Sequence, residues 1–151
     1  MPVLRPDKPV AWNFRKVVAP VVRAYFRRGD RLVRPATPTK RLHRFRIRTK
    51  RVRYVLELYQ EPFPGAVGRA LKQLRKLQQA LGGLQDQAVV ERRFHELASR
   101  ARRPAARAEL LAVAEHAARR QRELRGEFFR HWKRLRAAGF EERLLARIAR
   151  C

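Results

Sequence analysis

The chain is poor in the side chains that make disulfides, metal sites and nucleophiles. Its 151 residues include a single cysteine, Cys151, at the last position, and a single serine, Ser99. One cysteine excludes an intramolecular disulfide framework and a thiolate metal site. One serine leaves a Ser-His-Asp triad little to draw on. We therefore expect a reducing, cytoplasmic setting and no serine hydrolase.

Motifs for other catalytic chemistry are also missing. The stretch "GAVGRALK" lacks the spacing of a glycine-rich phosphate loop and opens a helix without a preceding strand. The histidines do not have metal-ligand spacing; they are His43, His95, His116 and His131. We expect a protein that is not an enzyme and that needs no metal and no cofactor.

Acidic residues are scarce relative to basic ones. Thirteen Asp and Glu stand against 38 Lys and Arg, which leaves a net charge of +25. Such an excess repels itself in a compact state and points to a polyanionic partner. Arginine predominates, and its planar guanidinium matches phosphate oxygens better than an ammonium does, although genome composition could also enrich it. Hydrophobic residues make up 45%, enough for the core of one domain.

Long hydrophobic runs are absent from the sequence. The longest apolar stretch, "VVAPVVRAYF", contains a proline and an arginine and is too short to span a bilayer. The start, "MPVLRPDKPVAW", has no apolar run after its charges and does not read as a secretory signal. We expect a soluble, cytoplasmic protein.

Helical periodicity dominates the chain, and no segment alternates as a strand does. It predicts helices over about residues 10–28, 38–61, 64–81, 86–102 and 104–138, followed by a short helical tail. Thr37 is placed to cap the second helix, with Pro38 at its first position. "LGGLQD" predicts a kink or a break after residue 81.

Short connections favour antiparallel neighbours. The sequence therefore predicts an all-α fold, an antiparallel up-down bundle of about four long helices plus a short C-terminal helix. The expected division is an N-terminal tail over residues 1–9, the bundle over 10–140 and a short helical tail over 141–151.

The segment "LHRFRIRTKRVRYVLELY" is the most basic of the expected helices. At 100° per residue its apolar side chains form one face, with Phe45, Val52, Leu56 and Tyr59 at the centre. Away from it runs what we call the basic strip: His43, Arg46, Lys50 and Arg53. The strip is roughly 15 Å long, so an extended chain of phosphates could meet several cations at once.

Two features qualify the basic strip. Glu57, four residues after Arg53, is placed to orient that guanidinium. Arg44, Arg48 and Arg51 form a second strip on another side of the helix. The alternative interpretation is a solvated surface helix, but such helices usually mix charge signs and this one carries almost none. For His43 a structural role and a ligand-binding role remain open.

Two later helices repeat the arrangement. In the third helix the basic residues away from the apolar face include Arg69, Lys72 and Lys76. In the fourth they are Arg119, Arg122, Arg130, Lys133 and Arg134. These residues are candidates to line a common basic groove.

The second and third expected helices resemble the CHAD family, the conserved-histidine α-helical domains. The family has a His-x-x-Arg-x-x-x-Lys-x-x-Arg-Tyr helix, then a Gln-x-x-Leu-Gly-x-x-x-Asp segment. Here the matching residues are His43, Arg46, Lys50, Arg53 and Tyr54, then Gln78, Leu81, Gly82 and Asp86. "FFRHWKRLRAAGF" is similar to the aromatic close of such a domain, so the resemblance spans about residues 10–140.

The resemblance implies a helical domain that binds inorganic polyphosphate, associates with polyphosphate granules and catalyses nothing. It implies polyphosphate contacts from His43, Arg46, Lys50 and Arg53, with Lys72 and Lys76 in addition. Asp86 matches the family's acid, and an N-cap role for it stays open. The length fits one half of the family's two-part domain, most like the C-terminal half. We therefore expect a symmetric homodimer. The alternative is a truncated or diverged unit that binds more weakly.

Two other functions remain open on the sequence alone. The same basic surfaces could straddle a DNA or RNA backbone without sequence preference, although no recognition helix is evident. A scaffold at anionic surfaces is the third alternative. The triphosphatase pattern Glu-x-Glu-x-Lys, often fused to the CHAD family, is missing from the sequence.

Overall fold

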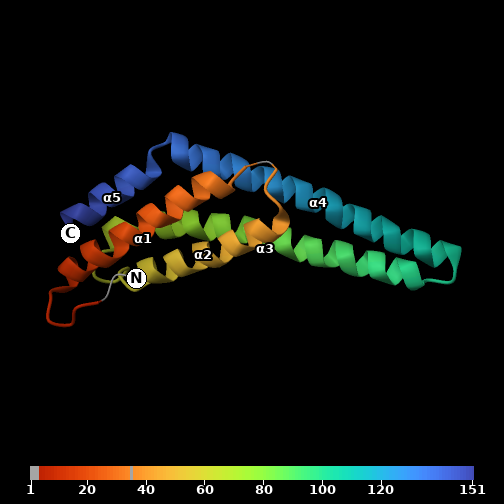
Figure 1. Ribbon diagram of the computed structural model, residues 1–151, viewed down its shortest axis with the longest axis horizontal. Coiled ribbons are helices and arrows are strands. Elements are labelled where there is room, and N and C mark those ends of the chain that lie inside the picture. Colours follow the sequence, from red (N-terminus) through yellow and green to blue (C-terminus); the bar gives the residue numbers. More distant parts are fainter. Residues whose placement is uncertain (1–3, 35) are drawn as a thin grey trace. The chain divides into compact units, whose positions relative to one another are not determined.

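The computed structural model describes residues 4–34 and 36–151, and all the regular structure in them is helical (Figure 1). The helices are α1 (Val10–Leu32), α2 (Thr39–Glu57), α3 (Pro64–Arg100), α4 (Pro104–Ala137) and α5 (Phe140–Arg150). The predicted all-α class is confirmed. Residues 1–3 of the expected tail, and Pro35 of the connection before α2, lie outside the described residues.

The chain forms two compact units, and α3 and α4 contribute to both. One unit comprises residues 1–78 and 129–151, and the other comprises residues 79–128. We call the first the aromatic unit, after its core, and the second the hairpin unit, since residues 79–128 are the antiparallel second part of α3 and first part of α4.

Ring stacking joins three helices in the core of the aromatic unit. Tyr25 and Phe26 of α1, Phe45 of α2 and Trp132 of α4 are each at most 4% exposed. Tyr25 stacks on Phe45 with ring centroids 5.0 Å apart, and Trp132 lies 5.4 Å from both Phe26 and Phe45. Such pairs contribute about 0.5–1.5 kcal/mol each beyond their buried area. The cluster fixes α1, α2 and the end of α4 against one another.

Gly29 of α1 allows Trp132 to come this close. A Cβ at this position would lie 2.1 Å from Cη2 of the indole and 3.1 Å from Cζ of Phe45. The indole Nε1 donates a hydrogen bond to Asp30 at 3.3 Å. α1 runs through both residues to Leu32, so the predicted end of this helix at residue 28 was wrong. Tertiary packing outweighs the helix-breaking tendency of glycine here.

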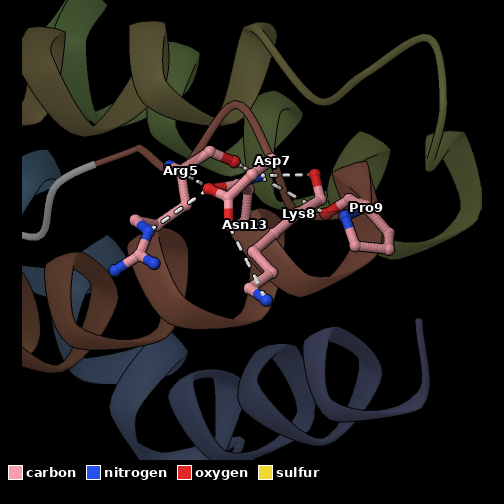
Figure 2. Close-up of polar contacts among 5 residues, drawn as sticks. All are labelled: Arg5, Asp7, Lys8, Pro9 and Asn13. Atoms are coloured by element: carbon pink, nitrogen blue, oxygen red, sulfur yellow. Dashed lines mark hydrogen bonds and ion pairs between the residues drawn. The ribbon is translucent and has the colours of Figure 1, made fainter.

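Part of the expected N-terminal tail is tied to α1 by one buried amide (Figure 2). Asn13 is 8% exposed, and its Nδ2 donates to the carbonyls of Arg5 at 2.8 Å and Lys8 at 3.2 Å. Its Oδ1 accepts a hydrogen bond from the Arg5 backbone N–H at 2.8 Å. A buried amide is satisfied on both sides in this way, so residues 5–8 are held against the first turn of α1.

The predicted start of α2 was displaced by one residue. Pro38 has ψ 145° and occupies the N-cap position, so Thr39 is the first helical residue. Thr37 is not the N-cap; its buried hydroxyl donates to the carbonyl of Leu32. Thr37 therefore ties the connection back to the end of α1. α2 also ends at Glu57, four residues before the predicted end.

The break predicted at "LGGLQD" is wrong, because α3 is one helix from Pro64 to Arg100. Leu81 and Leu84 are both 1% exposed, so the side chains on either side of the two glycines are buried. A Cβ on Gly83 would lie 3.0 Å from Cδ1 of Leu124 on α4, which shows how closely the two helices approach. Asp86 lies inside the helix and is exposed, so the N-cap role that was left open for it is excluded.

Candidate functional site

The rotation of α2 is fixed by a buried polar contact. Thr49 is fully buried and donates to the carbonyl of Phe45 at 3.0 Å. Since that donation uses its only hydrogen, Tyr25 donates to the Thr49 hydroxyl across the 3.0 Å contact. Burial raises the pKa of Tyr25 well above its usual range, the opposing effect of Thr49 being smaller. The predicted apolar face is confirmed, and Val52 and Leu56 are buried on it.

The basic strip lies beside this face. Lys50 is exposed, while His43, Arg46 and Arg53 are half-buried. The stems of the two arginines cover the edge of the core, as long cationic side chains commonly do. Among the residues that the structure describes, neither Arg46 nor Lys50 takes part in an ion pair. The two cations are therefore uncompensated along this side of α2.

Three nitrogens of the strip are buried without a hydrogen-bond partner in the described part of the chain: His43 Nδ1, Arg46 Nε and Arg53 Nε. Buried polar groups in proteins are nearly always satisfied. These three atoms have almost no exposed surface, so an outside anion would meet the exposed ends of these side chains and not these nitrogens.

Glu57 is the acidic residue that contacts the basic strip. Its Oε1 lies 3.6 Å from Nη1 of Arg53, as the four-residue spacing predicts, and 3.2 Å from Nη2 of Arg75 on α3. The second contact was not evident in the sequence. Glu57 holds Arg53 in place and links the end of α2 to α3, although such partly exposed pairs contribute little to stability.

Tyr54 lies under two cations of the strip. The Lys50 ammonium is 5.5 Å from the ring centroid, and the Arg53 guanidinium is 4.8 Å from it. Hydrogen bonding with Lys50 is the largest cause that lowers the pKa of the Tyr54 hydroxyl, and the charges of Lys50 and Arg53 lower it further. Cation–π contacts of this kind restrict the two side chains. Tyr54 thus helps to hold the heads of Lys50 and Arg53 in position.

A second basic surface is concave, and we call it the basic pocket. It has a volume of about 620 Å³ and is formed by α3, the end of α4 and α5, all within the aromatic unit. Its basic lining residues are Arg69, Lys72, Lys76, His131, Arg134, Arg143 and Arg147. No residue of α2 and no carboxylate is among the described residues that line it. Lys72 and Lys76 therefore belong to a surface that excludes the strip.

The family of the chain follows from comparison with known protein families. A family model described as CHAD domain matches residues 3–95. The chain belongs to the CHAD domain family. The matched range of this CHAD domain contains the basic strip and the α3 wall of the basic pocket, and leaves out its α4 and α5 walls. No curated protein and no solved structure matches the chain.

Most of the other predicted basic residues of this CHAD domain lie apart from the pocket lining. Arg130 and Lys133 of α4 are exposed in the aromatic unit, and Arg122 belongs to the hairpin unit. Arg134 of α4 was among the predicted groove residues, but the sequence prediction overlooked His131 on α4, and Arg143 and Arg147 on α5, as lining residues. The spacing of three from His131 to Arg134, and of four from Arg143 to Arg147, places each pair on one helix face. That signal was present, but it does not tell which helices meet.

The second strip of the CHAD domain is self-repelling. Partial burial of Arg48 is the largest cause that lowers its pKa, followed by the charges of Arg28, Arg51 and Arg44. Arg28 comes from α1, so cations of two helices gather beside the second strip.

No helix in the described part of the chain is long and apolar enough to cross a membrane.

Proposed function

We propose that this CHAD domain binds linear inorganic polyphosphate along the basic strip of α2, without catalysing a reaction on it. CHAD domains are associated with polyphosphate binding and are commonly non-catalytic. The observation that carries the proposal is the strip itself: His43, Arg46, Lys50 and Arg53 follow one helix side, with Glu57 as the acid beside Arg53.

The strip suits an anion with charge repeated along its length. Successive phosphates would meet cations spaced three and four residues apart, so one chain can neutralise several of them. Arg46 and Arg53 would donate to phosphate oxygens through their guanidinium forks. His43 would donate a hydrogen bond from its ring. Binding would release the counterions condensed on the polyanion, so affinity should fall steeply with added salt.

The proposed assembly is a homodimer in which two copies contribute their strips to one polyphosphate chain, as at a granule surface. Ile47, Tyr54 and Leu58 support it, because they are 40%, 46% and 74% exposed on the part of α2 between the basic strip and the second strip. Apolar side chains exposed together commonly mark an interaction surface. Light scattering, with and without polyphosphate, gives the mass; a mass of one chain in both conditions contradicts the dimer.

Nucleic acid is the rival polyanion, because a surface of this charge attracts any phosphate backbone at low salt. Competition between labelled long-chain polyphosphate and unlabelled duplex DNA or RNA, at physiological salt, separates the two. We expect polyphosphate to win by about tenfold or more, since single-stranded polyphosphate can follow one helix side. Equal or tighter binding of DNA or RNA would reject the proposed ligand.

A further inference from the structure

The basic pocket differs from the strip in shape. Its cations come from three helices: Arg69, Lys72 and Lys76 from α3, Arg134 from α4, and Arg143 and Arg147 from α5. We propose that this pocket is a separate binding site for a compact oligophosphate, a group carrying two or three adjoining phosphates. Two sources offer that chemistry, the end of a polyphosphate chain and a free small molecule. The proposal does not depend on binding by α2.

The size of the pocket selects a small ligand. A volume of about 620 Å³ lies within the range of roughly 300–1,000 Å³ that is usual for small-molecule sites. A single phosphate would leave most of this volume to water. A long extended chain would contact the cations of one wall at a time. A folded run of two or three phosphates reaches all three walls together.

The charge of the pocket selects an anion with several charges. Its lining has six Lys and Arg side chains and no carboxylate. Within the described part of the chain, none of those six forms an ion pair. The aromatic unit therefore concentrates positive charge here and does not neutralise it. A multivalent anion would relieve the repulsion between walls as well as bind each of them.

Six apolar residues also line the pocket, and three of them are alanines. They are Ala66, Ala70, Leu135, Ala138, Phe140 and Leu144. Alanine side chains leave the room that the ligand needs. Apolar lining residues lower the polarity beside a bound ligand, and lower polarity strengthens the attraction between phosphates and the surrounding cations.

His131 reports the positive potential of the pocket. Partial burial is the largest cause that lowers its pKa, and the charges of Arg134 and Lys76 lower it further. The charged groups that line the pocket with it are Arg69 and Lys72 on α3, and Arg143 and Arg147 on α5. All are cationic. A bound multivalent anion would offset the positive charges around His131, so His131 would take up a proton more readily and binding would strengthen as the pH falls.

The test is a calorimetric titration of the whole chain with tripolyphosphate, using three variants of equal charge change. The pocket variant, Lys72→Gln/Arg134→Gln/Arg143→Gln, removes one cation from each wall. The strip variant is Arg46→Gln/Lys50→Gln/Arg53→Gln, and the hairpin variant is Arg92→Gln/Arg100→Gln/Arg107→Gln. We expect the pocket variant to lose about thirtyfold or more in affinity and the hairpin variant, which lies outside both proposed sites, less than about threefold. The strip variant should lose clearly less than the pocket variant.

Two further arms complete the test. In the first arm, ATP and pyrophosphate are titrated in the same way as tripolyphosphate. Tight binding of ATP or pyrophosphate identifies a free small molecule as the ligand. Binding of tripolyphosphate and long chains alone identifies the end of a polyphosphate chain as the ligand. Arg143→Gln by itself, an exposed change on α5, is the second variant should the triple change disturb folding. Equal losses in the pocket and hairpin variants, loss in the strip variant alone, or no tripolyphosphate binding by the unaltered chain overturns the proposal.

Discussion

The aromatic unit and the hairpin unit differ sharply in how their charge is balanced. Residues 1–78 and 129–151 hold 28 Lys and Arg against 6 Asp and Glu, a net charge of +22, whereas residues 79–128 hold 10 against 7, a net charge of +3. A general arginine bias from genome composition would load both units alike. The excess is therefore tied to the unit that carries the basic strip and the basic pocket.

The few acids of the aromatic unit are largely used inside its own frame. Arg136 pairs with Asp30 at 3.0 Å and with Glu141 at 2.7 Å, which links α1, the end of α4 and α5. In the hairpin unit, by contrast, arginines pair with acids one turn away, as Arg120 does with Glu123 at 2.8 Å. The comparison shows that the hairpin unit nearly balances its charge with its own side chains, whereas the aromatic unit keeps a large positive excess, which is what the proposed anion binding would use.

The largest expected effect comes from removing three positive charges from the aromatic unit, compared with removing three from the hairpin unit. Arg46→Gln/Lys50→Gln/Arg53→Gln should weaken binding of long-chain polyphosphate by about 100-fold, since each lost charged hydrogen bond is worth about 1 kcal/mol or more. Arg92→Gln/Arg100→Gln/Arg107→Gln in the hairpin unit should change it less than about threefold. Fluorescence anisotropy at physiological salt measures both, and equal losses would mean that the charge acts diffusely.

The packing of the two units can be compared through one glycine in each. Gly29→Ala should cost about 1–3 kcal/mol of unfolding free energy, because the new methyl group meets the ring of Trp132, which is 4% exposed and cannot retreat. Gly83→Ala meets the end of the flexible Leu124 side chain, and better helix propensity offsets that contact. Urea unfolding measures both; a Gly83→Ala loss as large as that of Gly29→Ala would show equally rigid packing.

The sequence predicted features that depend on residues close together in the chain, and it did not predict features that depend on contacts between distant residues. Helical phase alone placed Phe45, Val52 and Leu56 in the core and brought Glu57 to Arg53, because both results depend on residues one or two turns apart. The basic pocket depends on which faces of α3, α4 and α5 meet, and its α3 and α5 residues lie some 70 positions apart in the sequence. Helical phase carries no information on that pairing.

The failure at "LGGLQD" has the same cause. Two adjacent glycines predict an interruption because each costs roughly 1 kcal/mol in a helix. In the hairpin unit that cost is offset by the burial of Leu81 and Leu84 and by the close approach of Leu124 to Gly83. The same holds for Gly29, whose partner Trp132 lies more than 100 residues away. In both places the helix-breaking tendency of glycine is outweighed by packing against a residue that is distant in the sequence.

A smaller effect is expected in the dependence of stability on pH. The pKa of His131 is lowered in the folded chain, so below its ordinary value of 6.5 the unfolded chain binds the proton first. The folded chain is therefore most stable above pH 6.5, where His131 is neutral in both states. Its unfolding free energy decreases as the pH falls from 6.5 toward the lowered pKa of His131 in the folded chain. Thermal unfolding between pH 7.5 and pH 5 should therefore show a flatter profile for His131→Gln than for the unaltered chain.

The matched control for this profile is His116→Gln. His116 is exposed, belongs to the hairpin unit and is not among the residues that line the basic pocket. The variant should follow the unaltered chain throughout the titration. If His131→Gln and His116→Gln flatten the profile equally, the repulsion within the basic pocket is not what makes acid destabilising.

The smallest expected effects have opposite signs in the two units. Arg48→Gln removes a cation that is repelled by Arg28, Arg51 and Arg44, so at low salt it should raise the melting temperature slightly, each like-charge pair being worth about 0.2–0.5 kcal/mol. Arg120→Gln removes the partner of Glu123 and Glu127 and should lower it. Both shifts should shrink toward zero in about 1 M salt, where screening acts over roughly 3 Å. A shift of the same sign in both variants would show that the two units do not differ in charge balance, whatever their composition.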